Sequence, residues 1–104
     1  MRRATHVVIF RATARVLDED YATTAALLRE MALRDFGCLE FHAVTAGDQE
    51  IALSYWTDLA AITAWKVQVE HLAAQRLGRE RWYSNYHVQI ARIERDYSSP
   101  KDAP

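Results

Sequence analysis

The chain is poor in the residues that cross-link, kink or anchor a protein. Its 104 residues include one cysteine, two prolines and three glycines. The single thiol, Cys38, cannot form an internal disulfide, so stability must come from packing. We interpret Cys38 as a small buried hydrophobe at the start of a strand. Arg11 and Arg15 interrupt the apolar N-terminal stretch. We therefore expect no signal peptide, no membrane span and a cytoplasmic location.

An excess of charge of one sign is also missing. Lysine and arginine total 13 and aspartate and glutamate 14, which gives a net charge of −1. Both signs are spread along the chain, and the absence of a basic stripe argues against nucleic acid as a partner. The histidines show no metal-binding spacing relative to each other, so we expect no metal site. There is also no glycine-rich phosphate loop and no nucleotide or flavin fingerprint, so we expect no tightly bound organic cofactor.

What the chain does have is the length and composition of one small globular domain. Half of its residues are hydrophobic, and a chain of this size can bury a modest core. No linker interrupts it. The Ser- and Pro-containing end has no pattern of its own, so we predict a single domain over residues 1–97 and a disordered tail over 98–104.

The hydrophobic periodicity predicts four strands and two helices. We place strands at 6–14, 38–45, 50–56 and 86–94, helices at 18–34 and from 57 or 58 to about 77, and a helical turn at 79–84. A Gly47 turn joins the second and third strands as a hairpin. The order is β-α-β-β-α-β, so the expected fold class is α+β: a ferredoxin-like domain whose antiparallel sheet carries its helices on one face.

The predicted strands are apolar on both faces, which an open sheet does not require. In the first strand Val7 and Ile9 alternate with Val8 and Phe10. We expect the helices to leave Val8, Phe10 and Trp56 uncovered, an apolar patch that monomers rarely tolerate. The sequence therefore predicts a homodimer in which two sheets pack against each other.

The stretch from Ser54 to Tyr86 contains all three tryptophans, three of the five tyrosines and His71. Aromatic side chains around a titratable group can line a pocket for a small hydrophobic or aromatic ligand, and they can equally form an ordinary core. His71 shares a helix face with Gln75, four residues further on, and a neutral imidazole could accept a phenol or enol proton.

Several residues of this stretch resemble the antibiotic biosynthesis monooxygenase domain family, within the dimeric α+β barrel superfamily. They are Ser54-Tyr55-Trp56, Leu59-Ala60-Ala61-Ile62, Ala64-Trp65-Lys66, His71, Ala74-Gln75, Gly78, Trp82-Tyr83 and Tyr86. The resemblance covers about residues 5–97. It implies a homodimer with a pocket between sheet and helices, and either cofactor-independent oxidation of polycyclic phenols or, in one branch, binding and breakdown of haem.

The resemblance matches the known chemistries only in part. Trp56 matches the tryptophan that ends the third strand of quinone-forming members, but Ala52 replaces their asparagine. Trp65 matches the haem-distorting tryptophan of the haem-degrading branch, but Gln75 replaces its axial histidine, and the asparagine of its first strand falls near Phe10.

From these matches we expect a cofactor-independent monooxygenase that acts on a small aromatic or enolic metabolite. The alternatives are a haem-binding or haem-degrading monooxygenase and a non-enzymatic, dimeric ligand-binding module. His71 is the candidate catalytic base. The candidate substrate-binding residues are Phe10, Trp56, Trp65, Gln75, Trp82, Tyr83 and Tyr86.

Overall fold

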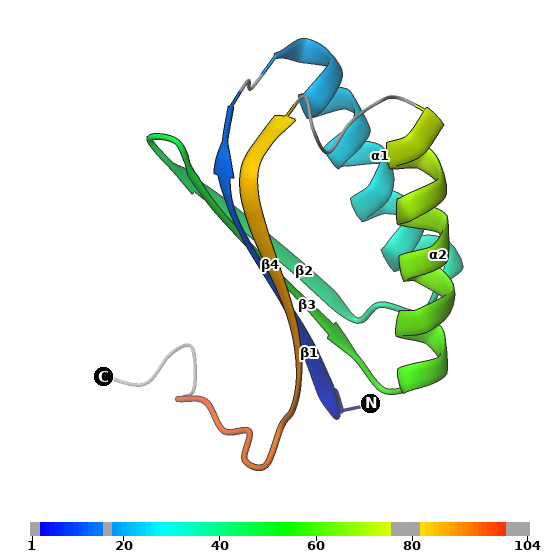
Figure 1. Cartoon of the computed structure of the whole chain (residues 1–104). Coiled ribbons are helices and arrows are strands. Elements are labelled where there is room, and N and C mark those ends of the chain that lie inside the picture. The colour runs from blue at the N-terminus through cyan, green and yellow to red at the C-terminus, as the bar shows by residue number, and fades with distance from the viewer. Residues whose placement is uncertain (1–2, 16–17, 76–81, 100–104) are drawn as a thin grey trace.

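A four-stranded antiparallel sheet with both helices on one side forms the framework of the chain (Figure 1). The computed structural model describes residues 3–15, 18–75 and 82–99, and for residues 72–75 it describes the backbone alone. The elements are β1 (His6–Ala14), α1 (Glu19–Asp35), β2 (Glu40–Ala46), β3 (Gln49–Trp56), α2 (Leu59–Gln75) and β4 (Tyr83–Arg92). The predicted ferredoxin-like βαββαβ fold is confirmed.

The sheet order is β2-β3-β1-β4, so the first strand lies in the middle between β3 and β4. Local chemistry sets the helix starts. Asp18 caps α1 by accepting a hydrogen bond from the Tyr21 backbone nitrogen at 2.8 Å. Asp58 does the same before α2, accepting from the Ala60 nitrogen at 2.7 Å. Each cap satisfies a backbone donor that the first helical turn leaves unpaired.

The hydrophobic core lies between the helices and the middle of the sheet. Its buried members are Val8, Ala32, Cys38, Trp56 and Ile62. Cys38 is a free, buried thiol, as predicted. Burial raises its pKa above the ordinary value for a cysteine, which favours the neutral thiol.

The structure reverses the expected roles of the two sheet faces. Val8 and Trp56 are buried against the helices, and Phe10 lies on that same helix-facing side. The prediction that these three residues would be left uncovered is wrong, because helix packing could have used either apolar face. The face away from the helices carries the opposite set, which we call the outer strip: Val7, Ile9, Ile51, Leu53 and Tyr55.

Several predicted strand boundaries also differ from the structure, including the end of the last strand, which falls at Arg92 where residue 94 was expected. The last strand begins at Tyr83, where a helical turn was expected through Ser84, because Ala14 of β1 pairs with Tyr83 across an irregularity in the register. The second strand begins at Glu40, two residues later than predicted. The expected end of the second helix at 76–77, the first half of the predicted turn at 79–81 and the last five residues of the predicted tail lie outside the described residues.

Within the described residues, neither helix combines the length and the apolar character that crossing a membrane would require.

Candidate functional site

A buried carboxylate and two tyrosines form a hydrogen-bonded chain under the first turn of α1. Glu50 lies on β3, where alternate residues point toward the helices, and it is 8% exposed. The Tyr21 hydroxyl, from α1, donates a hydrogen bond to Glu50 Oε2. The Tyr83 hydroxyl, from β4, donates to the Tyr21 hydroxyl oxygen at 3.3 Å. Two hydrogen bonds therefore connect polar groups from three elements that are distant in sequence.

The sheet register explains why these groups meet. On β1, Ala12 is paired with Glu50 on one side and with Tyr86 on the other. Directly paired residues of an antiparallel sheet share a face. The small Ala12 side chain therefore separates a carboxylate from the tyrosines of β4 on the helix-facing side. Asp18 fixes the start of α1, which places Tyr21 above them.

Burial sets the protonation of both ends of the chain. Loss of water raises the pKa of the Glu50 carboxyl above its ordinary value. Burial also raises the pKa of the Tyr83 phenol, and the nearby negative charge of Glu50 raises it further. Tyr83 therefore keeps its proton at neutral pH, while Glu50 binds and releases a proton at a higher pH than a solvated glutamate does.

An aromatic cluster surrounds the hydrogen-bonded chain. The Phe10 ring lies 5.4 Å from the Tyr83 ring, measured between centroids, and 6.1 Å from the Tyr86 ring. The Trp82 ring meets the Tyr21 ring edge-on at 5.5 Å. These distances lie in the range of favourable aromatic pairs. Four of the predicted substrate-binding residues, Phe10, Trp82, Tyr83 and Tyr86, therefore come together here.

An exposed apolar surface continues from this cluster along β4. We call it the inner strip, and it consists of Tyr86, Val88 and Ile90, which are between 38% and 49% exposed. Val88 pairs with Phe10, and Ile90 pairs with the buried Val8, so the strip lies on the helix-facing side of the sheet. The helices pack mainly on β2 and β3. The inner strip therefore stays exposed, although it lies on the helix-facing side of the sheet.

Two buried polar atoms beside Tyr21 lack partners among the residues that the structure describes. They are the Thr24 hydroxyl oxygen and the Trp82 indole nitrogen, and their residues are 2% and 5% exposed. Thr24 follows Tyr21 by three positions on α1, so the two side chains share a face. Buried polar atoms normally have a partner. A water molecule or a ligand atom could supply it here.

The other two tryptophans form a separate cluster at the opposite end of β3. Trp56 is 0% exposed, and its indole nitrogen donates to the Ser54 hydroxyl at 2.8 Å. Its ring lies 5.4 Å from the Trp65 ring, whose nitrogen donates to the Leu28 carbonyl at 3.4 Å. Six residues of strand separate Glu50 from Trp56, about 20 Å. The structure places Trp56 in the core and the partly buried Trp65 against it, and their binding of substrate stays a prediction.

His71 lies exposed on α2. The side chain of Gln75, one turn further on, lies outside the described residues, so the expected pairing of the two stays a prediction, as does the role of His71 as a base.

Sequence reasoning missed Glu50, Tyr21 and Thr24. The alternation of β3 was the available signal, because Glu50 and Ala52 are two positions apart and therefore point to the same face of the sheet. Within the described residues, no three histidine, cysteine, aspartate or glutamate side chains gather as a metal-binding group.

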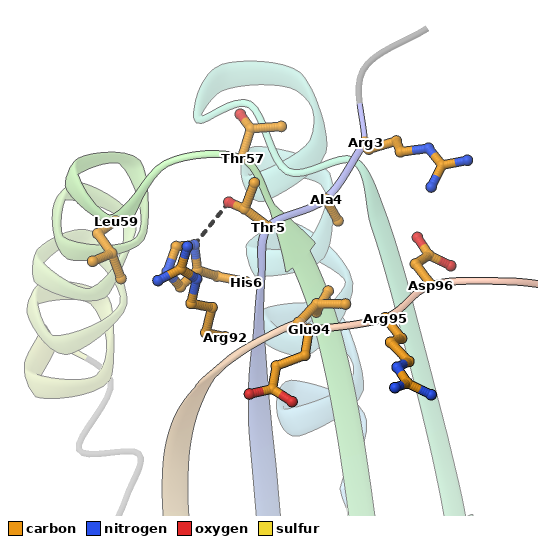
Figure 2. A pocket seen from close by; sticks show the side chains of 11 residues that line it. Arg3, Ala4, Thr5, His6, Thr57, Leu59, Arg92, Glu94, Arg95 and Asp96 are labelled. Atoms are coloured by element: carbon orange, nitrogen blue, oxygen red, sulfur yellow. Dashed lines mark hydrogen bonds between the residues drawn. The ribbon is translucent and has the colours of Figure 1, made fainter.

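A hollow separate from this site lies at the end of the sheet where β1 begins and β4 ends. It is lined mainly by residues 3–6 and 92–96, with Thr57 and Leu59 from the start of α2. Figure 2 shows the Arg92 guanidinium beside the His6 ring, which is hydrogen-bonded to the Thr5 hydroxyl at 2.8 Å. Basic and acidic side chains are mixed around it, so the hollow favours neither an anionic nor a cationic ligand.

Comparison with known proteins gives one relative of appreciable sequence identity and several structures of the same fold. No family model matches the chain. An uncharacterised protein of Bacillus subtilis (strain 168), YqjZ, is 34% identical over 91 residues, which cover 86% of this chain and 80% of that protein.

Among solved structures, a mutant form of SnoaB, a cofactor-independent oxygenase from Streptomyces nogalater, superposes with a TM-score of 0.73. It is 14% identical and covers 92% of this chain and 99% of its own. A candidate antibiotic biosynthesis monooxygenase from Chloroflexus aurantiacus J-10-fl has a TM-score of 0.57 at 14% identity, covering 91% of this chain and 98% of its own. At such identities the likeness establishes a common fold.

Proposed function

We propose that this chain, which shares its fold with proteins of the antibiotic biosynthesis monooxygenase type, belongs to that family, within the dimeric α+β barrel superfamily, and is a cofactor-independent monooxygenase. Its substrate is a small aromatic or enolic metabolite, and dioxygen is the oxidant. The likeness to SnoaB in fold supports the reaction class. The features of this chain that support a flat organic substrate are the aromatic cluster and the inner strip.

One observation carries the proposal: an apolar strip that lies open on the helix-facing side of the sheet and leads to buried, hydrogen-bonded polar groups. Tyr86, Val88 and Ile90 offer a surface on which a flat ring can lie, and Phe10 and Tyr83 close one end of it. Binding sites for small molecules typically combine such apolar walls with a few directed polar groups. Here Tyr83 supplies a hydroxyl at the junction.

The chemistry needs no group beyond the substrate and dioxygen. A phenol or enol that loses its proton becomes electron-rich enough to reduce dioxygen at a ring carbon conjugated with its oxygen. For a substrate in which that carbon is a methylene group in the keto form, one oxygen atom becomes the new carbonyl oxygen. The other leaves as water with the two hydrogens of the methylene. The protein must remove the proton, stabilise the oxyanion and keep bulk water out.

We further propose that the chain forms a homodimer joined through the outer strip. On β1 and β3, Ile9 pairs with Leu53 and Val7 pairs with Tyr55, which forms a continuous apolar surface on the face that no helix covers. Two copies packed sheet to sheet would bury this surface through a two-fold interface.

Oxygen uptake tests the proposal directly. The probe is anthrone, which consumes one dioxygen to give anthraquinone and water. The purified chain should accelerate both oxygen uptake and the appearance of quinone absorbance above the rate in buffer, and it should do so after dialysis against a chelator. No acceleration with anthrone or with simpler naphthols would contradict the oxygenase proposal. A Soret band that appears on adding haemin would instead favour haem chemistry.

The outer strip offers a separate test of the dimer, and the enzyme proposal does not depend on it.

Tight binding of anthrone without oxygen uptake would instead support the non-enzymatic ligand-binding module. In that case quenching of tryptophan fluorescence would report the binding, because Trp82 belongs to the aromatic cluster.

A further inference from the structure

We propose that Glu50 is the terminal proton acceptor of this site and that it ionises the substrate through a relay of the Tyr83 and Tyr21 hydroxyls. The inference rests on the proposed function, because it names the groups that would remove the substrate proton. Tyr83 would touch the substrate, while Tyr21 and Glu50 would act through it.

The direction of the hydrogen bonds supports a relay. Tyr83 donates to Tyr21, and Tyr21 donates to Glu50, so each hydroxyl proton already points toward the carboxylate. The oxygen lone pairs of Tyr83 are then available to a further donor. A substrate hydroxyl can be that donor, because a tyrosine oxygen accepts as well as donates.

The position of Tyr83 supplies the entrance to the relay. Glu50 and Tyr21 are buried, whereas Tyr83 is half-buried. Its ring contacts Phe10 at 5.4 Å and the partly exposed Tyr86 at 6.2 Å. A ring lying on the inner strip would bring its hydroxyl to Tyr83 before it could reach the carboxylate.

The proton balance of the step is simple. The substrate proton moves to the Tyr83 oxygen, the Tyr83 proton to the Tyr21 oxygen, and the Tyr21 proton to Glu50 Oε2. The products are a substrate oxyanion, two neutral tyrosines and a neutral Glu50 carboxyl. No electron moves in this step. The proton leaves Glu50 later by the reverse path, when water is released from the oxygenated substrate.

The surroundings of Glu50 suit this role. Burial raises the pKa of Glu50, which makes it a better proton acceptor than a solvated carboxylate. Among the described residues, the titratable groups that face it are Tyr21 from α1 and Tyr83 from β4, while β1 and β2 oppose it with Ala12 and Thr45. A substrate oxyanion could also meet the Trp82 indole nitrogen, a buried donor without a partner among the described residues.

The test compares Glu50→Gln and Tyr83→Phe with Glu40→Gln in the full chain, because Glu40 is an exposed glutamate on β2. His71→Ala tests the competing base. The glutamine of the Glu50→Gln variant keeps an oxygen that can accept from Tyr21, so the fold should survive, and circular dichroism checks this. With anthrone, we expect kcat to fall about 100-fold or more in both relay variants, because a general base typically contributes that much. Glu40→Gln should change kcat by less than about threefold. A loss in His71→Ala as large as that in the relay variants would assign the base to His71 and overturn the relay.

The pH profile distinguishes the relay from a structural role. In the unmodified chain, kcat should fall as the pH drops through the raised pKa of Glu50, because a carboxyl that is already protonated cannot take up the substrate proton. Glu50→Gln should remove this acid limb, and His71→Ala should keep it. An acid limb that survives in Glu50→Gln, or that disappears in His71→Ala, would overturn the proposal.

A binding measurement separates this inference from the oxygenase proposal. The probe is 4-nitrophenol, whose phenolate absorbs visible light. The unmodified chain should bind it with a larger phenolate fraction than the solution contains, and Glu50→Gln and Tyr83→Phe should abolish that excess. This result would support the relay even if anthrone were not oxidised. Failure of the unmodified chain to enrich the phenolate would overturn the relay while leaving oxygen uptake as a separate finding.

Discussion

Replacing Tyr21 by phenylalanine removes the hydroxyl that joins Glu50 to Tyr83 and changes nothing else in the aromatic cluster. The ring contacts with Trp82 and Tyr83, at 5.5 and 5.9 Å, remain possible. What is lost is one hydrogen bond to a buried carboxylate and one acceptor for Tyr83. A hydrogen bond to a charged group contributes about 1.5–3 kcal/mol, and a bond between neutral groups about 0.5–1.5 kcal/mol.

These two magnitudes predict that the cost of the substitution depends on pH. Burial raises the pKa of Glu50, so the folded chain holds this proton more tightly than the unfolded chain. The contribution of Glu50 to stability is therefore largest below the ordinary pKa of glutamate and declines as the pH rises through the raised value. Tyr21→Phe removes a donor to the charged form, which raises the pKa further and steepens that decline.

Urea unfolding at pH 4 and pH 8 measures the effect. We expect the free energy of unfolding to fall by about 0.5–1.5 kcal/mol at the lower pH and by about 1.5–3 kcal/mol at the higher one. Tyr97→Phe is the matched control, because Tyr97 is 89% exposed, and it should change neither value. An equal loss at both pH values would refute the assignment of a charged Glu50 as the acceptor of the Tyr21 hydrogen bond.

Two further predictions concern the turn and the outer face. Gly47 has a φ of 61° and its added Cβ would meet nothing within 4 Å, so Gly47→Ala should lower the free energy of unfolding by about 1–2 kcal/mol through the backbone alone. Gly47→Asn should cost less, and equal losses in urea would contradict this origin. Leu53→Glu places a charge in the outer strip and should reduce the mass seen by light scattering from two chains to one. Val67→Glu, at an exposed position of α2, should leave the mass unchanged, and a Leu53→Glu variant that stays dimeric would argue against this interface.

The order of the elements could be predicted because local patterns encode it. The Asp18 cap, the helical spacing that follows it and the alternation of β3 all depend on neighbours close in sequence. The choice of the covered sheet face could not be predicted in the same way. Val7 and Val8 are equally apolar, and only the packing of the helices decides which of the two is buried.

The site was predictable only where its residues are aromatic and close in sequence. Tyr83 and Tyr86 belong to one stretch that attracts attention by composition. Tyr21 fitted the apolar stripe of a helix, and nothing local indicates that its hydroxyl meets Glu50, 29 positions later in the chain. The start of β4 at Tyr83 depends on the register shift at Ala14, which is a property of the pairing of two distant strands.

The central place of β1 in the sheet has a consequence for the synthesis of this protein. Strand β1 is synthesised before the other three and pairs on one side with β3 and on the other with β4, where His6 meets Arg92. Pairings between distant parts of a chain form slowly, since a large loop must close first. The nascent chain therefore holds an unpaired edge of β1 until β4 has emerged, and the Tyr83 end of the site cannot form before that moment.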